Sequence, residues 1–318
     1  GYSGDFNAEL VNWIKSQPEV EYVNKQVRHS ANALQSDAPW GLTRISSAKK
    51  YTDAVKGEYR YVSETGQGVD VYVLDTGINF KHIDFEGRAR WGKTFAENST
   101  DDDVHGHGTH VAGTIAGRKY GVSKGANVIA VKVLGDDGYG STEEVVAGIE
   151  WVVKNPPRWG TPIKGKVINM SLGGDLDLAL NEAVNKAVDA GVHIVVAAGN
   201  ESTDACTKSP ASAEKAITVG ATTIDDTLAY FSNYGKCVDI LAPGRYILSA
   251  WIGSNQATKN ISGTSMASPH VAGIVADYIS LDQVKFTPET LSSKLTTLSN
   301  KNAIANLPKD TPNLLARN

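Results

Sequence analysis

The sequence predicts an α/β protein built on a doubly wound, mostly parallel sheet with helices on both faces. Four short segments are apolar and largely β-branched on both faces, as buried parallel strands are; they are Val69–Leu74, Val128–Leu134, Val167–Met170 and His193–Ala197. Segments with helical periodicity separate these strands along the chain. Since active sites of such folds lie beyond the carboxyl ends of the strands, we expect the chemistry just after them.

Two of the predicted helices carry clear boundary signals. Ser141 followed by Glu144 forms a capping box ahead of an apolar helical run. A second apolar face runs from Leu180 to Val188 and ends before Gly191, which supplies a left-handed cap. Both helices fall between predicted strands, as crossover connections do.

The beginning of the chain predicts a separate small unit. Four apolar residues recur at helical spacing, namely Phe6, Leu10, Trp13 and Ile14. Pro18 ends that run, and Val20 with Tyr22 then alternates like a strand. The segment Arg28–Asp37 is polar and without periodicity, which indicates a linker or processing region. We therefore predict residues 1–32 as a small unit with its linker, and residues 33–318 as the main domain.

Composition excludes some classes of partner. The 318 residues contain 31 Lys plus Arg against 35 Asp plus Glu, so a net charge of -4 gives no footprint for nucleic acid. The apolar runs are shorter than the roughly 20 residues that cross a bilayer, so we expect no membrane partner. The first residue is Gly1, without a signal sequence after it, so any targeting signal was removed or lies upstream.

The cysteines are Cys206 and Cys237, with no histidine at metal-ligand spacing beside them. They form either one disulfide or two free thiols. We favour the disulfide, which implies an oxidising compartment.

Asp75 is the first candidate for chemistry. It ends the first predicted strand and is followed by Thr76 and Gly77. A carboxylate in this place can hold an imidazole in one tautomer and stabilise its charged form. An aspartate before Thr-Gly is equally typical of a turn that hydrogen-bonds its own backbone.

A histidine-rich stretch is the second candidate. His107 lies between two glycines, which let the backbone turn tightly and leave one imidazole exposed as a general base. His105 and His110 lie close by, after the acidic run 101–103, so the same stretch also fits a zinc site. These residues alone do not decide between the two.

Ser265 and Asn200 are the third and fourth candidates. Gly263 precedes a small-residue helix whose free N–H groups would point at the space beside the Ser265 hydroxyl. Asn200 follows a strand and offers an amide donor at the same edge of the sheet. The alternative readings are a helix-capping serine and a turn asparagine.

The four stretches, in the chain order Asp, His, Asn, Ser, resemble the subtilisin superfamily of serine proteases. The run Ala38-Pro39-Trp40-Gly41-Leu42 onward is similar to its proteinase K branch, and Leu307–Leu315 is similar to cerevisin-like vacuolar members. The resemblance implies a serine endopeptidase in which Asp75 orients, His107 is the general base and Ser265 is the nucleophile. The Ser265 N–H and the Asn200 side chain would bind the oxyanion, while His105 and His110 become structural.

The resemblance also implies two substrate-binding edges that pair with an extended peptide, giving broad specificity and an apolar first pocket. The residues it implies for substrate binding are Gly138, Tyr139, Gly140, Ser171, Leu172, Gly173, Gly174, Ala197 and Gly199. Tyr139 departs from the small residue expected at its position. No cofactor is implied for catalysis, and protein and peptide substrates are the implied partners of a monomer.

Further implications concern processing and stability. The first thirty residues resemble the end of an inhibitory propeptide, which predicts self-cleavage between about His29 and Ala33 and inhibition by the chain's own propeptide. Cys206 and Cys237 fall where some relatives carry a disulfide, and Asp239 matches a calcium-binding carboxylate. We expect a vacuolar or secreted glycoprotein with Asn98 as the glycan acceptor. An inactive peptide-binding pseudoprotease is the alternative, although none of the three triad positions is replaced.

Overall fold

The computed structural model describes residues 2–24, 32–53, 56–63, 65–154, 163–281 and 286–318. The chain divides into two compact units, Gly1–Ala31 and Asn32–Asn318. The second unit begins at the strand β1 (Asn32–Gln35), which pairs antiparallel with β2 (Tyr59–Val62). The division therefore falls one residue before the boundary that the sequence predicts.

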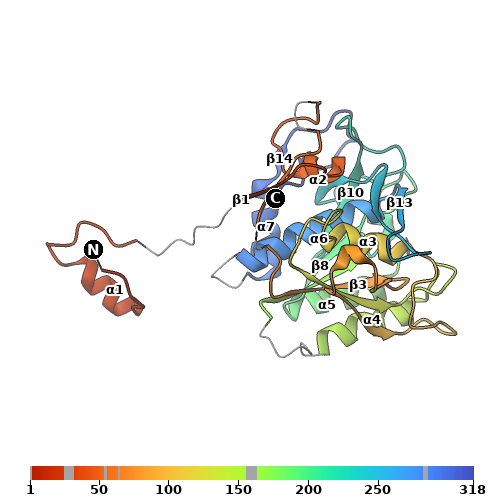
Figure 1. Ribbon diagram of the computed structural model, residues 1–318, viewed down its shortest axis with the longest axis horizontal. Helices are drawn as coiled ribbons and strands as arrows, with labels where there is room; N and C mark the ends of the chain where they lie inside the picture. The colour runs from red at the N-terminus through yellow and green to blue at the C-terminus, as the bar shows by residue number, and fades with distance from the viewer. Residues whose placement is uncertain (1, 25–31, 54–55, 64, 155–162, 282–285) are drawn as a thin grey trace. The chain divides into compact units, whose positions relative to one another are not determined.

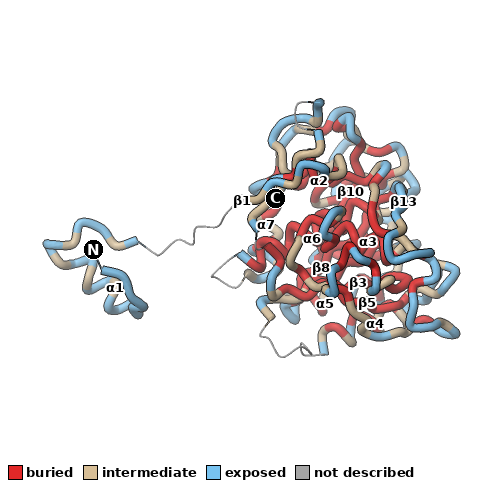
Figure 2. The backbone as a smooth tube through the Cα atoms, viewed as in Figure 1, coloured by how far each residue is buried: buried red, intermediate tan, exposed pale blue. Residues whose placement is uncertain are grey.

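The first unit is a short amphipathic helix with little around it. Helix α1 (Ala8–Lys15) begins at Asn7, whose side-chain oxygen accepts a 2.8 Å hydrogen bond from the Leu10 N–H. No residue of α1 is buried, as the pale tube in Figure 2 shows. The strand predicted at Val20–Tyr22 is wrong, because residues 20–24 form neither helix nor strand. Among residues 2–24 of this unit there is no second strand with which a strand at this place could pair.

A nine-stranded sheet organises the second unit (Figure 1). Its strand order is β14-β15-β11-β10-β8-β6-β3-β5-β4, and only the β14–β15 pair is antiparallel. The strands are β3 (Val69–Asp75), β4 (Ala89–Thr94), β5 (Asn127–Lys132), β6 (Gly165–Met170), β8 (His193–Ala197), β10 (Ile217–Thr222), β11 (Ile240–Pro243), β14 (Asn300–Lys301) and β15 (Leu314–Leu315). The four predicted strands are confirmed as neighbours in the middle of this sheet, β8-β6-β3-β5.

Strand β5 ends two residues earlier than the sequence predicts. Val133 and Leu134 leave the ladder, and their N–H groups both bond to the Asp75 carbonyl oxygen, at 3.0 and 3.2 Å. The apolar run continues past the strand because both side chains still pack against the core. This turn of the chain helps to hold the end of β3.

Helices cover both faces of the sheet, which confirms the predicted fold class. Val71 and Val73 of β3 face a core shared with α3 (His107–Ala116) and α6 (Thr264–Leu281). Tyr72 and Leu74 face the opposite core, shared with α4 (Thr142–Lys154) and α5 (Leu178–Asp189). Successive side chains of a strand point to opposite faces, so every residue of β3 is buried, as the buried colour in the middle of this unit in Figure 2 shows.

The boundary signals of the two predicted crossover helices are also confirmed. At the start of α4, Glu144 Oε2 accepts from the Ser141 N–H at 2.6 Å, and the Ser141 hydroxyl accepts from the Glu144 N–H at 3.2 Å. After α5, Gly191 has φ 89°, the left-handed region that glycine enters without strain. Both helices are therefore fixed by local sequence as well as by packing.

The remaining elements are short and lie around this frame. They are α2 (Trp40–Ile45), α7 (Pro288–Leu298), the 3-10 turns η1 (Ile83–Phe85) and η2 (Ala205–Thr207), and the strand pairs β7 (Gly174–Asp175) with β9 (Lys208–Ser209) and β12 (Ile247–Ala250) with β13 (Thr258–Ile261). No helix in the described ranges is long and apolar enough to cross a bilayer.

Cys206 and Cys237 form a disulfide, as predicted, and neither cysteine is free. The bond joins residues that are 31 positions apart in the chain. In the chain-entropy model a loop of this length stabilises the fold by about 3 to 4 kcal/mol.

Candidate active site

Asp75 and His107 form the first half of the site. Asp75 is the last residue of β3 and is fully buried, while His107 is the first residue of α3 with its side chain 21% exposed. The His107 Nδ1 lies 2.8 Å from Asp75 Oδ1 and 3.0 Å from Oδ2. Because an ionised carboxylate only accepts, this contact places the proton on Nδ1 and leaves Nε2 free to act as a base.

The environment of His107 favours its charged form. Burial, the largest single cause, lowers the pKa of His107, but the charge and hydrogen bond of Asp75 together with the charge of Asp103 outweigh it, so this pKa lies above its usual value. An imidazole with a raised pKa accepts a proton readily during attack and holds it until the leaving group needs it.

Ser265 lies in the first turn of α6, where backbone N–H groups have no partner within the helix. Its hydroxyl donates to the Ser171 carbonyl oxygen at 3.1 Å, and no described hydrogen bond joins it to His107. The Ser171 hydroxyl in turn donates to the Ser265 carbonyl oxygen at 2.8 Å. Ser171 therefore fixes the start of α6, and the Ser265 hydroxyl must turn away from it to reach a base.

Asn200 lies beside the start of α6. Its Oδ1 accepts from the Thr264 N–H at 2.8 Å and from the Thr264 hydroxyl at 3.1 Å. Since the oxygen end of the amide is occupied in this way, the NH₂ end remains as a donor. The structure thus brings Asn200 next to Ser265, as the sequence predicts for an oxyanion site.

Asn233 supports the Asn200 loop, and sequence reasoning missed it. It is fully buried, and its Oδ1 accepts from the Glu201 N–H at 3.1 Å and from the Thr203 N–H at 3.0 Å. Its Nδ2 donates to the Ala198 carbonyl oxygen at 2.9 Å. A side chain at Gly199 would collide with the Asn233 amide, and the φ of 102° at Gly199 also favours glycine. No local pattern marks Asn233, because its partners are about thirty residues away.

A pocket beside Ser265 gathers most of the predicted substrate residues. It is lined by Leu172, Gly173, Gly174, Ala197, Ala198, Gly199, Asn200, Glu201, Lys208, Ser209, Ala211, Thr264 and Ser265. Its walls are mainly small residues, and Glu201 and Lys208 are two charged members that the sequence did not suggest. Ser171, also predicted, is not among the lining residues, and Gly138, Tyr139 and Gly140 are not part of this pocket; they lie in the loop before α4, where Tyr139 is 80% exposed.

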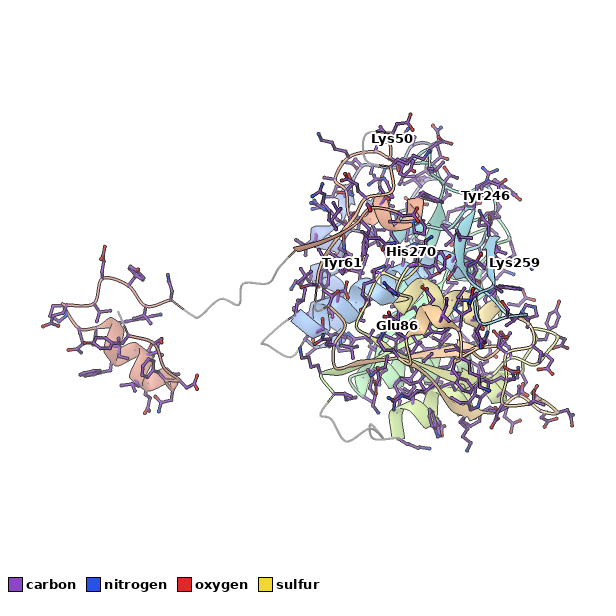
Figure 3. The ribbon with its side chains drawn as sticks, viewed as in Figure 1. Lys50, Tyr61, Glu86, Tyr246, Lys259 and His270 are labelled. Atoms are coloured by element: carbon purple, nitrogen blue, oxygen red, sulfur yellow. A yellow bond between two sulfur atoms is a disulfide. The ribbon has the colours of Figure 1, made fainter. Side chains whose placement is uncertain are left out.

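The histidine stretch does not form a zinc site. His110 is buried, and its Nε2 lies 2.9 Å from the Ile247 carbonyl oxygen and 3.1 Å from that of Lys259. Burial lowers the pKa of His110 to about 4, so it is neutral and structural. The ammonium group of Lys259, labelled in Figure 3, lies 4.2 Å from the centroid of the Trp251 ring. Among the described residues no cluster of three or more His, Cys, Asp or Glu could hold a metal.

Asp239 was predicted as a calcium ligand. One of its oxygens accepts from the Thr218 N–H at 2.8 Å, and burial raises the pKa of Asp239 to about 6. A desolvated carboxylate with so little support would gain from a hard cation, so its chemistry fits calcium. The other ligands of such a site would be main-chain oxygens and water.

Comparison with known proteins identifies the class. The family model described as the subtilase family matches residues 66–311. Subtilisin-like serine protease Pen ch 18 of Penicillium rubens is 51% identical over 333 residues, which cover 100% of this chain and 67% of the relative. Alkaline protease 2 of Aspergillus fumigatus is 50% identical over 337 residues, covering 100% and 68%.

A solved structure agrees with these relatives. The crystal structure of a cold adapted subtilisin-like serine proteinase superposes with a TM-score of 0.82 at 43% identity, covering 89% of this chain and 98% of that one. The fold and the site together define a serine endopeptidase. The chain belongs to the subtilase family.

Proposed function

We propose that the protein hydrolyses peptide bonds with broad specificity through a triad of Asp75, His107 and Ser265. The observation that carries this proposal is the contact of His107 Nδ1 with both oxygens of the buried Asp75 carboxylate. That contact orients the imidazole and supports its positive charge. The roles of the individual residues follow from it and from the place of Ser265.

In the first step the Ser265 oxygen attacks the peptide carbonyl carbon while its proton passes to His107 Nε2. The carbonyl oxygen becomes an oxyanion, for which the Ser265 N–H and the Asn200 NH₂ are the donors. The C–N bond then breaks, and His107 returns the proton to the leaving amine. Water hydrolyses the resulting acyl-enzyme by the same path in reverse, which restores the Ser265 hydroxyl.

The pocket beside Ser265 would take the side chain that precedes the scissile bond. Ser171, Leu172 and Gly173 form no strand ladder and offer an open backbone edge for an extended peptide. Main-chain pairing gives affinity without dependence on sequence, which supports broad specificity. We assign the facing edge to Gly138–Gly140.

Inhibition by a serine-directed reagent tests this proposal. A phosphonylating reagent should abolish casein hydrolysis and add its mass to the peptide that contains Ser265. A chelator alone should leave hydrolysis of casein at 25 °C unchanged. Loss of activity with the chelator, or full activity with Ser265 labelled, would contradict the proposal.

The first unit is proposed to be the end of an inhibitory propeptide that the enzyme removes itself. The cleavage would fall between about His29 and Ala33, and residues 29–31 lie outside the described residues. The mature protein should therefore be about thirty residues shorter than the full chain. Intact mass should show this loss for the wild type and not for Ser265→Ala. Equal processing of the two proteins would show that another protease makes the cut.

We also propose a structural calcium ion at Asp239, with main-chain oxygens near Glu214 and Ala216 as further ligands. The cation would remove the penalty of the desolvated carboxylate. Chelation should then speed heat inactivation, and added calcium should restore the wild-type rate. An Asp239→Asn variant should lose this dependence on calcium, whereas unaltered inactivation of the wild type under chelator would exclude the ion.

A vacuolar or secreted location is proposed for the protein. Its disulfide suits an oxidising compartment. Asn98 is exposed and is followed by Ser99 and Thr100, so it remains the proposed glycan acceptor. Asn169 is fully buried and its amide donates to the Ser171 hydroxyl, which makes it unsuitable as an acceptor.

A further inference from the structure

Asp103 lies four residues before His107, in the loop that leads into α3, and it is only 3% exposed. A buried carboxylate so close to the proposed base needs partners, because an unpaired buried charge is costly. Asp103 has five hydrogen-bond donors around it. No step of the reaction proposed above uses it.

Four of the five donors come from residues on both sides of His107 in the chain, and the fifth is the hydroxyl of Thr76, which follows β3. Oδ1 accepts from the Thr76 hydroxyl at 2.9 Å, the His105 N–H at 3.2 Å and the Gly106 N–H at 2.8 Å. Oδ2 accepts from the N–H and the hydroxyl of Thr109, at 2.9 and 2.6 Å. One carboxylate therefore fixes the loop before His107 and the first turn of α3 after it.

Thr76 links this arrangement to the Asp75 side of the site. Its hydroxyl donates to Asp103 and accepts from the Gly108 N–H at 3.0 Å. Thr76 directly follows Asp75, and Gly108 directly follows His107. The Thr76 hydroxyl therefore links the backbone next to Asp75 with the backbone next to His107. A displacement of Asp103 would therefore change the position of His107 relative to Asp75.

The charge of Asp103 also acts on the imidazole. His107 faces Asp75 on β3, His105 in its own loop at a ring separation of 6.3 Å, and the neutral His110 one turn along α3. On β5, the Lys132 ammonium bonds to the Thr76 carbonyl oxygen at 2.7 Å. Asp103 is the second carboxylate that raises the pKa of His107.

We propose that Asp103 is a positioning residue for the proposed general base. It holds His107 against Asp75 through the loop, the helix start and Thr76, and its negative charge supports the imidazolium that forms during attack. This inference rests on the proposed function of His107. Small displacements of a base from its working geometry cost rate rather than substrate binding.

The Asp103→Asn variant tests the proposal. The amide keeps the size of the side chain but removes the charge, and its NH₂ cannot accept from both donors of Thr109. We expect kcat for a peptide substrate to fall by about 10- to 100-fold with KM nearly unchanged. The acid limb of kcat/KM, which reports His107 in the free enzyme, should move to lower pH.

Asp84→Asn is the matched control. Asp84 is also buried, with 6% exposure, and accepts from the Lys119 N–H at 2.8 Å, but it makes no described contact with the triad. Both variants should lose thermal stability, whereas only Asp103→Asn should shift the acid limb. The same kcat loss in both variants with an unmoved acid limb would overturn the proposal and leave Asp103 merely structural.

A second pair of variants applies if Asp103→Asn does not fold. Thr76→Val removes the linking hydroxyl without changing size and should lower kcat with KM unchanged, while Thr76→Ser should restore most of the rate. Equal rates for the two would overturn the proposal. Both experiments start from a wild type that hydrolyses peptide and loses this activity when the phosphonylating reagent modifies Ser265. Failure of the proposed function would therefore be seen first and separately.

Discussion

Replacing Ser265 with alanine is expected to lower kcat for peptide hydrolysis by about 10⁶-fold, the magnitude established for subtilisin itself, a member of the same family. The variant lacks the oxygen that is proposed to form the acyl-enzyme, so only the proposed oxyanion donors and substrate binding would remain to accelerate the reaction. Asn200 and the first turn of α6 stay in place, because Thr264 and Ser171 hold them through groups other than the Ser265 hydroxyl. KM should therefore change little.

The measurement is single-turnover hydrolysis of a chromogenic peptide, since contaminating protease would otherwise mask so small a rate. Ser254→Ala is the control, because it removes an exposed serine hydroxyl that only accepts from the Gln256 N–H in its own turn. It should retain full activity. A Ser265→Ala protein with more than a thousandth of the wild-type rate, after correction for contaminants, would remove Ser265 from the nucleophile's role.

Asp277→Asn is expected to stabilise the fold at neutral and alkaline pH. Asp277 lies in α6 with 3% exposure, and its Oδ1 accepts from the Ser123 hydroxyl at 2.6 Å. Its Oδ2 has no hydrogen-bond partner among the described residues. Burial raises the pKa of Asp277 to about 7, so ionising it costs free energy that the unfolded chain does not pay.

The sign follows from proton binding. Between about pH 4 and pH 7 the folded state keeps on Asp277 a proton that the unfolded state has lost, so the contribution of Asp277 to the wild-type free energy of unfolding falls as pH rises. A shift of about three pH units corresponds to about 4 kcal/mol at most.

Lys124 reduces the free-energy cost of ionising Asp277 when Lys124 itself is charged. Burial lowers the pKa of Lys124 to about 7. Its ammonium group donates to the Gln35 side-chain oxygen and lies 5.7 Å from the ring of Tyr61, labelled in Figure 3.

Thermal unfolding of Asp277→Asn in a Ser265→Ala background, which prevents autolysis, measures this effect. The gain in Tm over the parent should be small at pH 4, grow with pH and level off above about pH 7. Asp225→Asn, which changes an exposed aspartate, should show no such trend. A gain independent of pH, or one that shrinks as pH rises, would show that Asp277 is not the group responsible.

The fold was predictable because its central strands carry their own signal. Four strands with apolar residues on both faces become four neighbours in the sheet, and Ser141, Glu144 and Gly191 mark the ends of their helices. The Val20–Tyr22 strand failed because alternation alone cannot provide a pairing partner. The end of β5 was misplaced because Val133 stays buried and Leu134 stays packed against the core after they leave the ladder.

The candidate site was predictable at the residues proposed to do the chemistry and not at those that hold them in place. Asp75 and His107 are in hydrogen-bond contact, as expected. Asn200 is held next to Ser265 by its hydrogen bond with the N–H of the preceding residue, Thr264. Asn233 and Asp103 could not be found in this way, because their roles consist of hydrogen bonds to backbone groups of several segments. Asp103 was visible only as part of an acidic run beside histidines, which suggested a metal.

The central claim is that Ser265 becomes acylated during peptide hydrolysis, with His107 as its base. Mixing the enzyme with an activated acyl ester, quenching in acid and mapping the adduct by mass spectrometry tests it most directly. We predict one acyl group on the peptide containing Ser265 in the wild type, much slower acylation in His107→Ala and none in Ser265→Ala. An adduct on another residue, or acylation that does not depend on His107, would contradict the account.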